Sequence, residues 1–215
     1  NDKNNTQLKE KIKITTLKSD YNVKSKELFD LENKINIAKS NIENNSFLPK
    51  SIAAVLNSKA LSGICDRIEN LIEVNDAHKL AISSSLGAAK NFIVTTDFDS
   101  AKRAIKYLKN SDLGRCTFFP LDTIKSRYID NAALNSIKDL TGFIGIASDL
   151  VSYDKKYKNI IENQLGNVII VDSLDDANKI GKKTDYKYKI VSLEGDILYS
   201  GGAVSGGRVN TNNDD

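Results

Sequence analysis

The sequence predicts an α/β (α+β) fold of two related lobes, preceded by a long coiled-coil helix. Three observations lead to this prediction: a heptad pattern near the amino terminus, a strand-and-helix pattern that occurs twice, and a glycine-rich stretch near the carboxyl end. The chain has 215 residues, of which 40% are hydrophobic, so it can bury a core. We predict an arm segment over residues 1–46, a globular domain over 47–207 and a polar tail over 208–215.

Residues 14–42 carry a seam of residues whose spacing alternates between three and four, and only one of them is a charged residue. The seam consists of Ile14, Leu17, Tyr21, Lys24, Leu28, Leu31, Ile35, Ala38 and Ile42. This pattern predicts a coiled-coil helix about 43 Å long, which ends at the Asn and Ser residues before Pro49. The sequence contains no second heptad, so we expect an antiparallel return helix to come from outside this chain. The chain also lacks Met, and we expect it to be an internal part of a longer polypeptide.

The globular region repeats one pattern of strand and helix. Residues 165–171 resemble residues 86–94, because each has a Leu-Gly pair followed by Asn and an apolar run. A capping residue precedes a helix in both places, Ser173 in one and Thr96 or Asp97 in the other. We predict helices over 76–86 and 98–109, a helix from 174, and strands over 91–95, 115–119, 165–171 and 188–192. The sequence therefore predicts two related halves, about 51–122 and 142–207, with a chance likeness of two βα units as the alternative.

A predicted hairpin over 188–199 leads into the glycine-rich stretch, which contains Gly201, Gly202, Gly206 and Gly207. Glycine has no Cβ, so two backbones can approach closely here, as they do at a contact between chains. A flexible linker is the alternative. A phosphate-binding loop is disfavoured, because Arg208 and Val209 stand where such a loop needs Lys and Ser or Thr.

The sequence predicts no catalytic residue, no metal site and no cofactor. Cys65 and Cys116 match no zinc spacing, and His78 is the one histidine. Ser152 and Lys155 match the SxxK pattern of acyl-transfer enzymes, but the companion motifs do not occur. The chain has neither an apolar run of membrane-spanning length nor a secretory signal, so we expect a cytoplasmic protein with no membrane partner.

The charge of the chain permits a nucleic-acid partner without requiring one. It has 31 basic and 28 acidic residues, a formal net charge of +3. Basic residues cluster over 102–109, 125–127 and 182–189, and such clusters are most often solvated faces. Our candidates for DNA contact are Lys182, Lys183, Lys187, Lys189 and Arg208. Such contact would be directed at phosphates, weak, independent of base sequence and sensitive to salt.

Several blocks occur in a fixed order: residues 61–74, 101–108, 114–122 (GRCTFFPLD), 142–154 and 201–207 (GGAVSGG). Together they resemble the hinge domain of SMC (structural maintenance of chromosomes) proteins, of the bacterial chromosome partition and condensation type. The resemblance covers about residues 51–207, and the predicted coiled coil stands where the entering arm of that family is expected.

The resemblance implies a non-catalytic hinge whose copies pair into a ring and join two coiled-coil arms that lead to distant ATPase heads. It also implies that Gly201, Gly202, Gly206 and Gly207 form the pairing surface, in a homodimer that contacts DNA weakly and lies at the nucleoid. The first alternative is a coiled-coil adaptor whose globular head binds another protein. A nucleotide-dependent enzyme ranks after it.

Overall fold

The structure is a computed structural model that describes residues 2–43 and 47–207. It divides the chain into two compact units, Asn1–Ala53 and Ala54–Asp215. The predicted tail over 208–215 lies outside the described residues, and the predicted limits of the domain and its halves remain predictions. None of the described helices is both long and apolar enough to cross a lipid bilayer.

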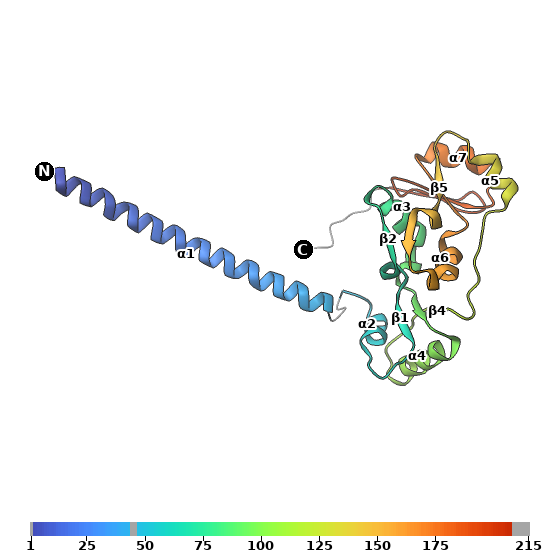
Figure 1. Ribbon diagram of the computed structural model, residues 1–215, viewed down its shortest axis with the longest axis horizontal. Coiled ribbons are helices and arrows are strands. Elements are labelled where there is room, and N and C mark those ends of the chain that lie inside the picture. The colour runs from blue at the N-terminus through green and yellow to red at the C-terminus, as the bar shows by residue number, and fades with distance from the viewer. Residues whose placement is uncertain (1, 44–46, 208–215) are drawn as a thin grey trace. The chain divides into compact units, whose positions relative to one another are not determined.

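The first unit is dominated by α1 (Asp2–Glu43), a single helix of 42 residues (Figure 1). The predicted helix over the heptad pattern is therefore confirmed. The large apolar side chains of the seam are exposed along its length, and their exposed fractions range from 52% at Ile14 to 72% at Tyr21. An apolar stripe of this length is stable only when another helix covers it, because one helix cannot bury its own seam.

The second unit contains two runs of elements, and α2 lies across the border between the units. The first run is α2 (Lys50–Asn57), β1 (Ile64–Arg67), η1 (Ile68–Leu71), β2 (Ile72–Val74), η2 (Asp76–His78), α3 (Lys79–Leu86), η3 (Gly87–Asn91), β3 (Ile93–Thr95), α4 (Phe98–Asn110) and β4 (Phe118–Pro120). The second run is α5 (Asn131–Ile137), β5 (Phe143–Ile146), η4 (Ala147–Leu150), β6 (Val151–Tyr153), η5 (Lys155–Tyr157), α6 (Lys158–Leu165), β7 (Val168–Val171), α7 (Leu174–Lys183), β8 (Lys189–Ser192), β9 (Ile197–Leu198) and β10 (Val204–Ser205).

The two runs share one strand topology. In the first sheet, ordered β1-β3-β4, β1 is antiparallel to β3 and β3 is parallel to β4. In the second sheet, ordered β10-β9-β8-β7-β5, β5 is antiparallel to β7 and β7 is parallel to β8. The short antiparallel pair of β2 and β6 joins the two runs. The strands β9 and β10 have no counterpart in the first run, so the second sheet extends further on that side.

The helices α4 and α7 begin where the sequence predicts, because each has a side-chain cap. The Asp97 carboxylate accepts a hydrogen bond from the Ser100 N–H at 2.7 Å, and the Ser173 hydroxyl accepts one from the Asp176 N–H at 3.2 Å. The apolar face of α4 is only partly buried, however. Ala101, Ala104 and Leu108 are buried, whereas Phe98 and Ile105 are 58% and 41% exposed.

The strand predicted over 115–119 is shifted in the structure, where β4 spans Phe118–Pro120. Pro120 is the last residue of β4 and stands opposite Thr95. Proline lacks an N–H and is tolerated on an edge strand, where one side needs no ladder hydrogen bond. The strands β1, β2, β5 and β6 were not predicted, since they have only three or four residues each.

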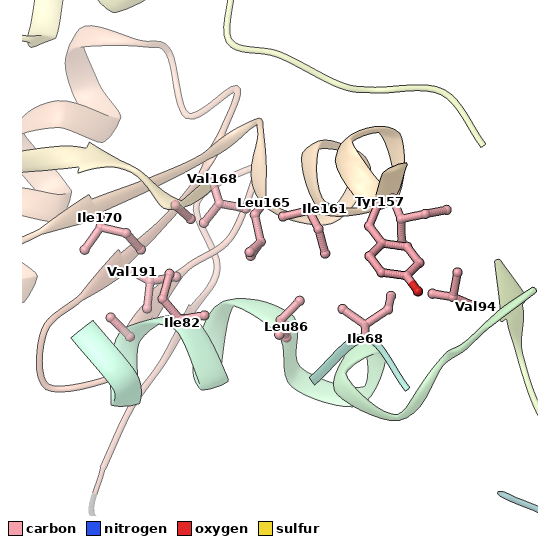
Figure 2. Close-up of a cluster of buried hydrophobic side chains, with 13 residues drawn as sticks. Ile68, Ile82, Leu86, Val94, Tyr157, Ile161, Leu165, Val168, Ile170 and Val191 are labelled. Atoms are coloured by element: carbon pink, nitrogen blue, oxygen red, sulfur yellow. The ribbon is translucent and has the colours of Figure 1, made fainter. Parts of the chain in front are cut away.

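Two hydrophobic clusters lie on opposite faces of the second sheet. The first is built from both runs, because Ile68, Ile82 and Leu86 pack with Ile161 and Leu165 (Figure 2). Val168, Ile170 and Val191 face this cluster, while Ile169, Val171 and Ile190 face the second cluster beside α5 and α7. The alternation follows from the period of two along a strand. Because residues of both runs share the first cluster, neither half has that core alone.

The segment between the two runs lies along α6. The hydroxyls of Ser126 and Tyr128 both donate to the Glu162 carboxylate, at 2.8 and 2.6 Å. The Asn163 side chain donates to the Lys125 carbonyl at 2.7 Å. These bonds hold an otherwise irregular connection on the surface of the helix.

Candidate functional site

The first glycine pair forms the turn between β9 and β10. Gly201 and Gly202 have φ angles of +88° and +93°, a region that favours glycine. Their N–H groups donate to the carbonyls of Tyr186 and Tyr199 at 2.8 and 2.9 Å, and the Tyr199 N–H donates to Ala203 at 2.7 Å. The predicted hairpin of β8 and β9 is confirmed, and it is followed by a further hairpin that the sequence analysis missed.

The second glycine pair lies against the turn between β8 and β9. A Cβ on Gly206 would stand 2.2 Å from an Asp196 carboxylate oxygen. The Gly207 N–H donates to that same oxygen at 3.3 Å, and Gly207 has a φ of +121°. The group that comes close to Gly206 is therefore the Asp196 side chain of the same chain, whereas the sequence predicts an approach of two backbones. A role of the four glycines between chains remains a prediction.

The edge of the second sheet is open at β10. Within the described residues β10 pairs with β9 alone, and Val204 is 57% exposed. A groove of about 380 Å³ next to it is lined by Leu174, Asp175 and Tyr186, among others. An edge strand presents unpaired N–H and C=O groups that can pair with a strand of another chain.

The first sheet has a matching open edge at β4, which in the described chain pairs only with β3. Its counterpart in the second sheet is β8, whose corresponding edge is covered by β9. A groove of about 530 Å³ lies beside α4 and is lined by Ile105, Leu108, Lys109, Gly114, Arg115 and Cys116. The strands β4 and β10 are thus two edge strands of the second unit that each lie next to a groove.

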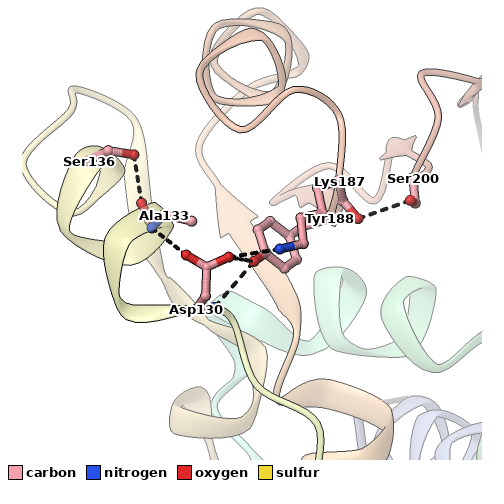
Figure 3. A network of polar contacts seen from close by, with 6 residues as sticks. All are labelled: Asp130, Ala133, Ser136, Lys187, Tyr188 and Ser200. Atoms are coloured by element: carbon pink, nitrogen blue, oxygen red, sulfur yellow. Dashed lines mark hydrogen bonds and ion pairs between the residues drawn. The ribbon is translucent and has the colours of Figure 1, made fainter.

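The predicted DNA-contact residues do not form one set of available cations. Lys182 and Lys183 are exposed in the last turn of α7. Lys187 instead pairs with Asp130 at 2.9 Å (Figure 3), and Lys189 donates to the Ser85 carbonyl at 2.7 Å. Burial lowers the pKa of the Lys189 ammonium, because the charged form loses hydration. Arg208 lies outside the described residues.

A different basic stripe lies on α4. Lys102, Lys106 and Lys109 are exposed and recur at helical spacing, and Asp99 is the one acidic residue of the helix. None of the ion pairs among the described residues involves these three lysines. This cluster lies in the predicted basic segment 102–109 but is not among the predicted DNA-contact residues, and the signal in the sequence is that Asp99 is the single acid among these basic residues.

The described residues contain no group of three or more His, Cys, Asp or Glu side chains that could hold a metal ion.

Comparison with known proteins gives one consistent family. The model of the SMC proteins flexible hinge domain matches residues 61–181. The Chromosome partition protein Smc of Mesomycoplasma hyorhinis is 40% identical over 174 residues, which are 80% of this chain and 18% of that protein. The protein of the same name from Bacillus subtilis (strain 168) is 38% identical over 165 residues, 76% of this chain and 14% of that protein. The chain therefore spans less than a fifth of the length of these relatives.

Two solved structures have the same fold. The hinge domain of Geobacillus stearothermophilus SMC, crystallised as an asymmetric dimer, is 36% identical and superposes with a TM-score of 0.78, covering 84% of this chain and 74% of that one. The Pyrococcus furiosus SMC hinge domain is 29% identical with a TM-score of 0.62, covering 81% of this chain and 92% of that one. Because the family model covers more than half of the sequence, the chain belongs to the family of SMC flexible hinge domains.

Proposed function

We propose that this chain is a dimerisation hinge, which pairs with a second copy of itself and so joins two coiled-coil arms of a chromosome partition protein. The observation that carries the proposal is the pair of open strand edges, β10 in one half and β4 in the other. The exposed seam of α1 supports the arm, because it needs a second helix to cover it. Distant ATPase heads and a place at the nucleoid in the cytoplasm belong to the same proposal.

The two edges support a closed dimer. When β10 of one copy adds antiparallel to β4 of the other, a two-fold axis brings the remaining β10 and β4 together as well. Both copies then lose the open edges at β10 and β4, so these two edges cannot add further copies. Antiparallel addition also places α4 of one copy and α7 of the other on the same face of the joined sheet. The reason is that the two-fold axis relating two antiparallel strands is perpendicular to the sheet, and a rotation about it does not exchange the two faces.

The mass of the chain in solution tests this proposal. We expect sedimentation equilibrium at micromolar concentration to give twice the 23.7 kDa chain mass. A variant with Leu28→Glu and Leu31→Glu removes association through the α1 seam, where both residues are more than half exposed. This variant is expected to stay dimeric. A monomer at these concentrations contradicts the hinge proposal.

We also propose that the chain contacts DNA weakly through phosphates. The lysine stripe of α4 supports this, because no acidic partner neutralises it among the described residues, while the first turn of α7 carries Asp175 and Asp176. Lys182 and Lys183 remain in the proposal as a second contact. We expect dissociation constants of about 10⁻⁴ to 10⁻⁶ M at physiological salt.

Fluorescence anisotropy with duplex DNA over a series of salt concentrations separates the two basic surfaces. Lys102→Glu with Lys106→Glu is expected to weaken binding and to reduce the salt slope by about one or two. Lys182→Glu with Lys183→Glu is the matched pair of changes on α7. Binding that does not depend on salt would be incompatible with phosphate contact.

A further inference from the structure

Within the second half, a leucine of β9 packs onto α7 at Gly181. Leu198 is 3% exposed and packs in the second hydrophobic cluster. A Cβ on Gly181 of α7 would lie 2.7 Å from a Leu198 methyl carbon. The strand next to β8 therefore presses an apolar side chain onto the helix, at a position where the helix carries glycine.

The equivalent place on α4, in the first half, is an open groove. The residue of α4 that matches Gly181 is Ile105, 76 positions earlier, and it is 41% exposed. The groove of about 530 Å³ beside it has no strand next to β4 to cover it in the described chain. The first half thus lacks the apolar side chain that Leu198 supplies to the second half, and it exposes an isoleucine at that place.

Val204 in β10 is placed to supply that side chain to another copy. It stands opposite Leu198 in the antiparallel pair of β9 and β10, so the two side chains lie on the same face of the sheet. This is the face of α7, and antiparallel addition keeps α4 of a second copy on the same face. Valine is smaller than leucine, which suits a groove where the Ile105 side chain occupies part of the space that Leu198 fills above Gly181.

The charges beside the two grooves are complementary. Asp175 is exposed and lines the groove next to Val204, whereas Lys109 and Arg115 line the groove beside Ile105. Pairing the grooves of two copies brings an acidic rim against a basic rim around an apolar centre. Pairing two β10 edges directly would bring Asp175 against its own counterpart, which is repulsive.

We propose that Val204 of one copy inserts into the groove beside α4 of the second copy, with Asp175 facing Lys109, and that these contacts select the register of the dimer. The inference rests on the proposed dimerisation and adds the receiving surface. It makes each contact heterologous, from the second half of one copy to the first half of the other, so a two-fold dimer contains the contact twice.

Mixing two variants tests the inference. Val204→Arg and Ile105→Arg each disrupt both contacts of their own homodimer, and each is expected to weaken dimerisation at least about tenfold. A mixture contains heterodimers with one intact contact, from Val204 of the Ile105→Arg copy to Ile105 of the Val204→Arg copy. We therefore expect dimer mass to reappear in the mixture, at a concentration where each variant alone is monomeric. An Ile105→Arg variant with unchanged affinity, or a mixture that stays monomeric, overturns the inference.

Charge reversal gives a second measurement that does not depend on a buried position. Asp175→Lys and Lys109→Asp are each expected to weaken the dimer roughly three- to tenfold, and the double variant is expected to recover most of the loss. Equal dimerisation affinities of all four proteins would overturn the inference about the receiving surface. The wild-type dimer, and with it the proposed function, would still stand. A monomeric wild type instead removes the proposed function itself. Circular dichroism of each variant checks that the fold is intact.

Discussion

The hydroxyl of Tyr188, the residue before β8, donates a hydrogen bond to the carboxylate of Asp130, the residue that caps α5 (Figure 3). The same carboxylate accepts from the Lys187 ammonium at 2.9 Å and from the Ala133 N–H at 2.8 Å. In return, the Asp130 N–H donates to the Tyr188 oxygen at 3.2 Å. One side chain thus attaches the end of the segment between the halves to the second sheet.

We expect Tyr188→Phe to lower the free energy of unfolding by about 1.5 kcal/mol or more, because the buried ring stays while the bond to the charged Asp130 carboxylate and the bond from the Asp130 N–H are lost. Asp130→Asn is expected to destabilise as well, and the double variant is expected to lose less than the sum of the two. Urea denaturation of the four proteins measures this coupling. Tyr21→Phe on α1, where the side chain is 72% exposed, is the control. Strict additivity would show that the two groups act independently.

The Asp130 contacts also predict a dependence on pH. The bonds from Tyr188, Lys187 and the Ala133 N–H hold the pKa of the Asp130 carboxyl well below its ordinary range. A lowered folded pKa stabilises the fold above the unfolded pKa of about 3.9, and this contribution is lost as the pH falls towards the folded pKa. We therefore expect the wild type to lose stability below about pH 5 more steeply than Asp130→Asn.

Denaturation midpoints measured between about pH 7 and pH 2 give the comparison. The variant still has Asp97, Asp154 and Asp176, whose pKa values are also lowered by hydrogen bonds, so its stability falls too, but with a smaller slope. Parallel curves for the two proteins would contradict the assigned role of Asp130.

Gly166 is expected to tolerate alanine poorly, because the segment between the halves passes directly over it. A Cβ there would lie 2.2 Å from the Arg127 carbonyl and 2.5 Å from the Glu162 carbonyl. We expect Gly166→Ala to cost about 1–3 kcal/mol in the free energy of unfolding. Its counterpart Gly87 has a φ of +52° and no atom within 4 Å of an added Cβ, so Gly87→Ala isolates backbone strain of about 1–2 kcal/mol. Proteolysis between residues 122 and 130 should increase only in Gly166→Ala.

Leu165 lies in the hydrophobic cluster that both halves share, and it is fully buried (Figure 2). We expect Leu165→Ala to destabilise the chain by about 3–5 kcal/mol, from lost apolar contact and the cavity left behind. Leu174→Ala, at a position 39% exposed, is the matched control with a small effect. Because the cluster is shared, unfolding of the second unit should remain one transition. Two separate transitions in Leu165→Ala would mean that the halves hold independent cores.

Local patterns in the sequence predicted α1, α4 and α7, and they predicted where α4 and α7 begin. The heptad of α1 and the caps Asp97 and Ser173 act over a few neighbouring residues, so they can be read without tertiary information. The short strands β2 and β6 could not be found in this way. Each has three residues and is held by pairing with the other, 79 positions away in the chain.

For the candidate site, too, the sequence determined some features and the tertiary structure determined others. The sequence by itself determined where the glycines lie, at Gly201, Gly202, Gly206 and Gly207, and where the basic residues lie, at Lys182, Lys183, Lys187 and Lys189. Only the tertiary structure decided that Lys187 is paired with Asp130, that Lys189 donates to the Ser85 carbonyl, and that β4 and β10 are left as open edges. The reason is physical: composition and spacing set what a residue can do, whereas the partners available to it are set by segments that are distant in the chain and meet only in the fold.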